Sequence, residues 1–121
     1  MTESGTNHRK GARWQLEVSE RRWNGALVIK VAGRLGAAAA PRLTTTLAEA
    51  LSAGERRILL DLGGLDYISS AGTIALEVVA ARLRSEGGEL VLCAPTPPVR
   101  LALTLSGFPE DVRVIAGLAS G

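Results

Sequence analysis

Strand-length apolar runs alternate with helix-forming segments along most of this 121-residue chain. Residues 57–62 (R-I-L-L-D-L) form an apolar run of strand length, and a helical pattern follows at about 70–85. A second strand pattern at 89–94 is followed by a helix that starts within the prolines at 95–98 and continues to about 105. Strands joined through helices pair in parallel, because parallel neighbours need a crossover connection. The alternation therefore predicts parallel strands in the second half of the chain.

The first half of the chain begins with the pattern of a hairpin. Residues 14–19 alternate apolar with polar side chains, Asn24-Gly25 favours a tight turn, and residues 26–32 resume as a strand. Gly33 to Gly36 are expected to break that strand before a helix at 37–53, and a short last strand is expected at 112–115. The sequence thus predicts an α/β fold with a mixed four- to five-stranded sheet and helices, in the order β-β-α-β-α-β-α-β.

The composition is that of a folded domain with few aromatic side chains. Hydrophobic residues make up 46% of the chain and aromatic residues only 3%, so we expect a core mainly of Leu, Val, Ile and Ala. The net charge is +2, and part of the positive surplus lies in residues 8–13. We therefore expect residues 1–12 to form a disordered tail, residues 13–117 to form the domain, and no nucleic-acid partner.

Cysteine and histidine are too scarce for several kinds of site. Cys93 is the single cysteine, so the chain has no internal disulfide, which fits a reducing compartment, and its apolar neighbours predict a buried strand thiol. A zinc cluster or a catalytic Cys–His pair is not expected, since His8 is the single histidine. No segment has the pattern of a signal peptide or a membrane span. The sequence predicts a cytoplasmic protein without a metal, a cofactor or membrane insertion.

Two hydroxyls, those of Ser69 and Ser70, lie where a strand is expected to stop and a helix to start. A serine before a helix commonly caps free backbone N–H groups, and that role alone would explain either of them. Helical spacing places Leu76, Val79 and Leu83 on one face of the helix, which we assign to the sheet.

The same spacing creates a second apolar stripe on the opposite side of this helix. Its members are Ser70, Ile74, Val78 and Ala81, with Glu77 and Arg84 beside them. Such a stripe is typical of a docking surface, although a helix sandwiched within its own fold would show it too. Phosphorylation of Ser70 would add about −1.5 to −2 charges, and the helix N-terminus would stabilise them. A partner docked on the stripe would instead face this charge at the edge of its contact. The pattern therefore indicates a switch.

The segment 61–72 (D-L-G-G-L-D-Y-I-S-S-A-G) resembles the signature of STAS domains, specifically that of the bacterial anti-sigma factor antagonists. Other segments resemble further parts of the same family: 33–35 (G-R-L), 87–93 (G-G-E-L-V-L-C), 97–100 (P-P-V-R) and 105–108 (L-S-G-F). The resemblance extends over about residues 16–115. It implies a STAS-like α/β fold.

The resemblance also implies regulation by partner switching. Such proteins bind an anti-sigma factor, often a serine kinase of the histidine-kinase-like ATPase fold, and thereby free a sigma factor. The kinase inactivates the antagonist by phosphorylating a serine, and a serine phosphatase restores it. Ser70 takes the position of that serine, Ser69 replaces an Asp of the family, and Gly36 stands where many antagonists carry an Asp in a loop of the partner surface. The predicted partner-binding residues are Arg34, Gly36, Ser69, Ser70, Gly72, Thr73, Ile74, Glu77, Val78 and Ala81.

Other functions stay open beside this one. The replaced Asp residues and the second apolar stripe also fit a STAS scaffold without a phosphorylation cycle, or a module of a membrane transport complex, and a homodimer is compatible with each interpretation. We do not expect an enzyme, because no positioned base, metal cluster or oxyanion site accompanies the carboxylates of Asp61 and Asp66. Gly63-Gly64 lacks the rest of a phosphate-loop pattern and is interpreted as a turn, with Asp61 contributing turn hydrogen bonds.

Overall fold

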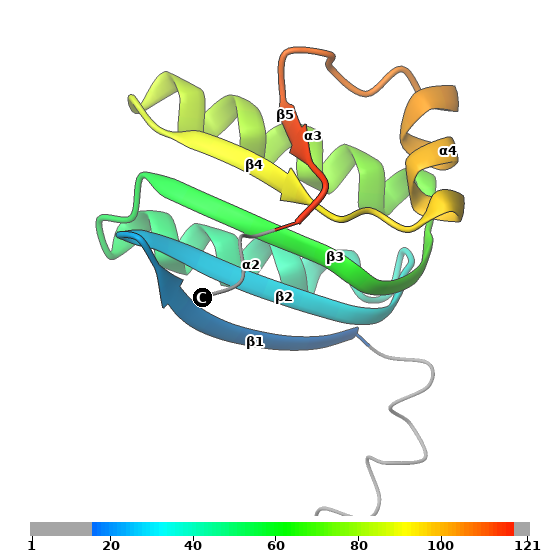
Figure 1. Ribbon diagram of the computed structural model, residues 1–121, viewed down its shortest axis with the longest axis horizontal. Helices are drawn as coiled ribbons and strands as arrows, with labels where there is room; N and C mark the ends of the chain where they lie inside the picture. The colour runs from blue at the N-terminus through cyan, green and yellow to red at the C-terminus, as the bar shows by residue number, and fades with distance from the viewer. Residues whose placement is uncertain (1–15, 118–121) are drawn as a thin grey trace, which may run out of the picture.

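The computed structural model describes residues 16–117, which form a five-stranded sheet with three helices (Figure 1). The predicted α/β class and the predicted order of elements are confirmed. The predicted tail at 1–12 and Trp14 lie outside the described residues. The elements are β1 (Leu16–Trp23), β2 (Ala26–Leu35), α2 (Ala40–Ser52), β3 (Arg57–Ile68), α3 (Ser70–Ser85), β4 (Glu89–Cys93), α4 (Pro97–Leu105) and β5 (Arg113–Ile115).

The sheet is mixed, with its strands in the order in which they occur along the chain. β1 pairs antiparallel with β2, and the remaining neighbours pair in parallel. Asn24 (φ 50°) and Gly25 (φ 81°) supply the two left-handed positions that a type I′ hairpin turn needs, as predicted. The carboxyl ends of β2, β3 and β4 meet at one edge of the sheet, where α3 and α4 begin (Figure 1).

β2 and β3 are both longer than the sequence predicts. The predicted break at Gly33 to Gly36 is wrong, since β2 continues to Leu35. The predicted turn at Gly63-Gly64 is also wrong, since β3 runs through both glycines to Ile68. These extra residues carry the β2–β3 pair as far as the start of α3.

Glycine serves close strand packing here rather than a turn. The register of the β2–β3 pair shifts between Lys30 and Ala32, and again between Gly33 and Arg34, so β3 accommodates extra residues while staying paired. A Cβ added to Gly64 would lie only 2.9 Å from the Cβ of Ala32. The glycine therefore allows an irregular strand pair to approach closely.

The helices follow the prediction more closely than the strands. α3 has the predicted limits. α2 begins at Ala40, later than predicted, with Pro41 in its first turn, and the chain leaves it through Gly54 (φ 99°). α4 begins at Pro97, within the predicted proline run. Proline at a helix start and glycine after a helix end thus mark boundaries that the sequence already indicates.

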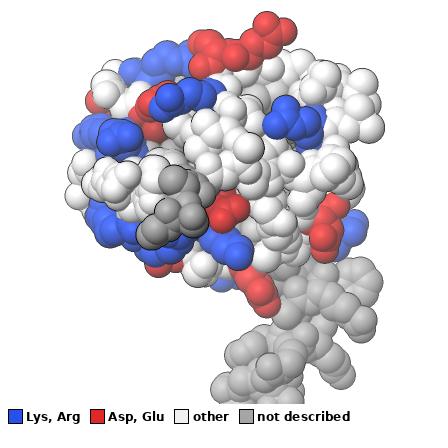
Figure 2. Space-filling model, viewed as in Figure 1, with Lys and Arg blue, Asp and Glu red and all other residues white. Residues whose placement is uncertain are grey.

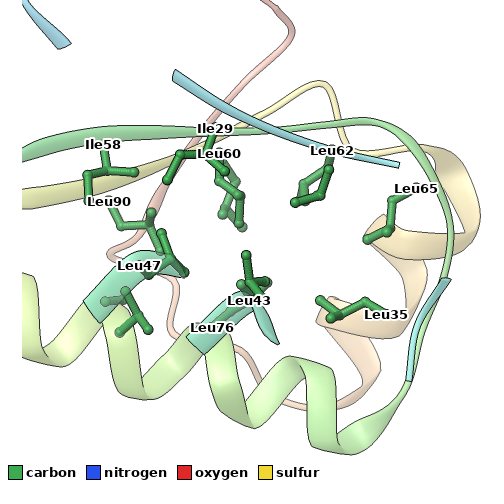
Figure 3. Packing of buried hydrophobic residues seen from close by; sticks show 14 of the residues in the cluster. Ile29, Leu35, Leu43, Leu47, Ile58, Leu60, Leu62, Leu65, Leu76 and Leu90 are labelled. Atoms are coloured by element: carbon green, nitrogen blue, oxygen red, sulfur yellow. The ribbon is translucent and has the colours of Figure 1, made fainter. Parts of the chain in front are cut away.

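α2 and α3 contact each other and bury the larger core against one face of the sheet (Figure 3). Leu43 and Leu47 of α2 and Leu76 of α3 point toward the leucines and isoleucines of β2, β3 and β4 (Figure 3). α4 adds Val99 and Leu103 to the same core. The core is aliphatic, as the composition predicts. The largest fully buried side chains are those of Leu16, Ile29, Leu35, Leu43, Leu47, Ile58, Leu60, Leu62, Leu65, Leu76, Leu83 and Leu92.

The opposite face of the sheet has a smaller apolar cluster and a charged surface. Positive and negative side chains are interspersed on this side of the molecule, whereas the surface over α4 is mostly uncharged (Figure 2). None of the described helices combines the length and the apolar character needed to span a membrane. The buried members of the smaller cluster are Ala26, Val28, Leu59, Val91 and Cys93.

Candidate functional site

The junction between β3 and α3 divides two roles between adjacent serines. The backbone N–H of Ser69 donates to the carbonyl of Leu35 (2.9 Å), which extends the β2–β3 pairing to the last residue before the helix. Ser69 is extended (φ −92°, ψ 174°), and its Oγ accepts from the N–H of Gly72 at 3.2 Å. Its carbonyl accepts from both the N–H (2.9 Å) and the Oγ1 (3.1 Å) of Thr73. Ser69 is therefore the helix cap.

Ser70 is the first residue of α3, and its side chain is exposed. Within residues 16–117 no hydrogen bond occupies its Oγ. The N–H groups of the first helical turn have no partner within the helix, and the helix dipole places partial positive charge at this end. An anion on Ser70 would therefore be stabilised where it forms.

An exposed apolar ridge follows Ser70 along α3. Ile74 is 58% exposed and Val78 is 55% exposed, and Ala81 continues the same line. These three residues are called the α3 ridge below. Glu77 beside it is half-buried. The ridge is too exposed for the alternative in which the helix is sandwiched within its own fold, so that alternative is wrong.

The other face of α3 packs into the core, as the helical spacing predicts. Leu76, Val79 and Leu83 are buried against the sheet. Arg84, expected beside the second stripe, is exposed and forms an ion pair with Asp111 (3.0 Å) in the segment before β5.

Two predicted partner-binding residues, Gly72 and Thr73, are corrected to structural roles because both are buried. A Cβ added to Gly72 would lie 2.7 Å from the carbonyl oxygen and 2.8 Å from the Cγ of Leu35. Thr73 is 3% exposed and bonds back to Ser69. Both residues fix the first turn of α3 against the end of β2. They position Ser70 and lie out of reach of a docking protein.

Arg34 and Gly36 lie at the same end of the sheet as Ser70, on either side of Leu35. The guanidinium carbon of Arg34 is 4.3 Å from the centroid of the Tyr67 ring, within cation–π range. A Cβ added to Gly36 would lie 3.7 Å from Cε2 of the same ring. Sequence reasoning did not single out Tyr67, which is 40% exposed. Its position just before the two serines was the available signal.

The remaining polar residues near the strand ends have local roles. Oδ1 of Asp61 accepts from the N–H of Gly63 (2.9 Å), but this hydrogen bond lies within β3 rather than in the predicted turn. Burial raises the pKa of the Cys93 thiol, and the nearby Asp61 raises it further. Among residues 16–117 no group of three or more His, Cys, Asp or Glu side chains is placed to hold a metal ion.

The features of this junction match a known family. A sequence model of the STAS domain family matches residues 15–120. The chain belongs to the STAS domain family. A Bordetella bronchiseptica protein, BtrV, named as a candidate anti-sigma factor antagonist, is 47% identical over 85 residues, which cover 70% of this chain and 73% of that protein. The resemblance of the motif at 61–72 to STAS domains, and to anti-sigma factor antagonists among them, is thereby confirmed.

Solved antagonist structures share this STAS fold. One from Mycobacterium paratuberculosis aligns with a TM-score of 0.76 and 20% identity, over 85% of this chain and 87% of that one. The Bacillus protein SpoIIAA in its phosphorylated form aligns with a TM-score of 0.65 and 19% identity, over 83% of this chain and 91% of that one. At these identities the likeness shows the fold alone.

Proposed function

We propose that this STAS domain is an anti-sigma factor antagonist that acts by partner switching, with Ser70 as its phospho-acceptor. The observation that carries the proposal is the exposed hydroxyl of Ser70 at the head of the exposed α3 ridge. The relative BtrV, named as an antagonist, supports the partner class, and the existence of SpoIIAA in phosphorylated and unphosphorylated forms supports the cycle. The binding partner is then an anti-sigma factor that is also a serine kinase, and a serine phosphatase restores the free form.

The phosphoryl transfer needs no catalytic group of this chain. The kinase breaks the bond to the γ-phosphoryl group of ATP and forms the Oγ–P bond of Ser70, with release of ADP and of the hydroxyl proton. The product carries about −1.5 to −2 charges. The N-terminus of α3 stabilises this charge, so the fold survives the modification.

The same charge would disrupt docking. A partner that covers the α3 ridge would have to bury or displace a solvated dianion at one end of its contact. A loss of about 3 kcal/mol of binding free energy weakens a complex more than a hundredfold. Phosphorylation would therefore release the anti-sigma factor without unfolding the antagonist.

Ser69 gives this switch a neutral cap. It occupies the position of the family's Asp, and its hydroxyl already accepts from the N–H of Gly72. Ser69 then positions the acceptor, and Ser70 is the residue that is modified. The proposed contact surface comprises Arg34, Gly36, Ser70, Ile74, Glu77, Val78 and Ala81, with Ser69 at its edge.

The test is incubation of the chain with its cognate anti-sigma kinase and ATP, followed by mass spectrometry of the modified peptide. We expect one phosphate on Ser70, none on the Ser70→Ala variant, and continued modification of Ser69→Ala. Phosphate only on Ser69, or none at all, would overturn the site assignment. A large homo-assembly in size-exclusion chromatography with light scattering, together with no phosphate, would favour the scaffold.

A further inference from the structure

An exposed tyrosine lies near the carboxyl end of β3, three residues before Ser70. Tyr67 is 40% exposed and is the only tyrosine of a chain in which aromatic residues make up 3%. Its backbone is held in the β2–β3 pair, directly before the capped turn that presents Ser70. Exposed aromatic side chains on a rigid support are the type enriched at the energetic centre of protein interfaces.

A strand irregularity places Arg34 over this ring. Arg34 lies directly opposite Tyr67 across β2 and β3, because the register shifts by one residue between Gly33 and Arg34. Without that shift Arg34 would lie opposite Asp66, a carboxylate. Instead its guanidinium carbon is 4.3 Å from the Tyr67 centroid, and within the described part of the chain it forms no ion pair with a carboxylate. The irregularity therefore re-aims a cation toward an aromatic surface, as strand bulges near functional sites commonly do.

Gly36 leaves the edge of the ring uncovered. A Cβ at this position would be in van der Waals contact with Cε2 of Tyr67, at 3.7 Å. Any larger side chain, including the Asp of many family members, would cover part of that edge. The glycine thus keeps the ring accessible, while Arg34 occupies one of its faces.

We infer that Tyr67 and Arg34 together form the anchor of the anti-sigma factor contact, an inference that rests on the proposed function. The Tyr67 ring enters an apolar pocket of the partner, and a carboxylate of the partner pairs with the Arg34 guanidinium. The anchor lies at the same end of the sheet as the start of α3, since the next pair along β2 and β3 is Leu35 and Ile68, and the N–H of Ser69 bonds to Leu35. Along the chain, Tyr67 precedes Ser70 and the α3 ridge follows it.

The test is isothermal titration of the full chain with its purified anti-sigma factor. Tyr67→Ala should weaken binding about 30-fold, as expected for an interface anchor. Tyr67→Phe, which keeps the ring, should bind within about threefold of wild type. Arg34→Glu should also weaken binding at least about 30-fold, because it faces the partner carboxylate with a like charge. Arg22→Ala, an exposed arginine at the hairpin end of the sheet, is the matched control and should bind as wild type does.

The outcomes separate this inference from the proposed function. If the wild-type chain does not bind the anti-sigma factor, the proposed function fails. Ser70→Glu places a negative charge at the phospho-acceptor and tests the proposed function. If wild type binds and Ser70→Glu does not, the proposed function stands. If Tyr67→Ala and Arg34→Glu then both bind within about twofold of wild type, only the anchor is overturned. Arg34→Glu keeps the test decisive if Tyr67→Ala does not fold, since Arg34 is exposed and its replacement leaves the ring in place. Circular dichroism confirms the fold of each variant.

Discussion

Truncation of the α3 ridge should weaken partner binding by an amount that follows from its exposure. Ile74 is 58% exposed and Val78 is 55% exposed, and a partner can bury at most these exposed parts. At about 0.8 kcal/mol per buried methylene, Ile→Ala is worth about 2.4 kcal/mol and Val→Ala about 1.6 kcal/mol when fully buried. The exposed shares are then about 1.4 and about 0.9 kcal/mol. The double variant Ile74→Ala/Val78→Ala should therefore bind about 40-fold more weakly.

The assay is isothermal titration with the purified anti-sigma factor, beside a urea unfolding curve of each variant. Folding stability should change little, because the higher helix propensity of alanine offsets part of the packing lost on the buried side of each residue. Leu101→Ala/Leu105→Ala is a matched control, since these leucines have the same spacing on α4 and are 58% and 77% exposed. Unchanged binding of the ridge variant, or equal weakening of the α4 variant, would refute the assignment of the docking surface.

Three further predictions concern the fold around the switch and the opposite end of the sheet. Gly72→Ala should lower the free energy of unfolding by about 2 kcal/mol in urea denaturation, because the added methyl would lie 2.7 Å from the carbonyl oxygen of Leu35; an unchanged midpoint would contradict the close packing. Ser69→Ala should cost about 1 kcal/mol through the lost cap while Ser69→Asp retains stability, and equal melting temperatures for the two variants would argue against the cap. Hydrogen bonds from Arg22 lower the pKa of Glu55, so this pair stabilises the fold above the ordinary carboxyl pKa and loses that contribution as the pH falls through the lowered value. Thermal melts across acidic pH should show a flatter profile for Glu55→Gln than for wild type, and parallel profiles would exclude the linkage.

The local rules of helix formation explain why α3 could be predicted well. Its apolar spacing separates a buried face from an exposed ridge, and the structure has both. Either serine could have been the cap by sequence alone. The choice of Ser69 depends on its hydrogen bond to Leu35, which belongs to a different strand. This hydrogen bond is a tertiary contact, so the spacing of apolar residues along the helix does not predict it.

The strand pair β2–β3 shows where sequence reasoning failed. Glycine commonly interrupts regular structure, so the sequence predicts a strand break at 33–36 and a turn at 63–64. In the sheet Gly64 instead makes room for Ala32, and the register shifts place Arg34 opposite Tyr67. Gly72 is likewise buried because Leu35, from the neighbouring strand β2, packs against it. Each of these features depends on which residue of the neighbouring element lies opposite. Local patterns in one sequence do not specify that pairing.

The most direct measurement compares the affinity of the anti-sigma factor for the unmodified chain and for the same chain phosphorylated stoichiometrically on Ser70. A dianion at the head of the α3 ridge should raise the dissociation constant more than about a hundredfold, with an unchanged circular dichroism spectrum. Equal dissociation constants for the two forms would contradict the central claim that Ser70 controls access to the ridge.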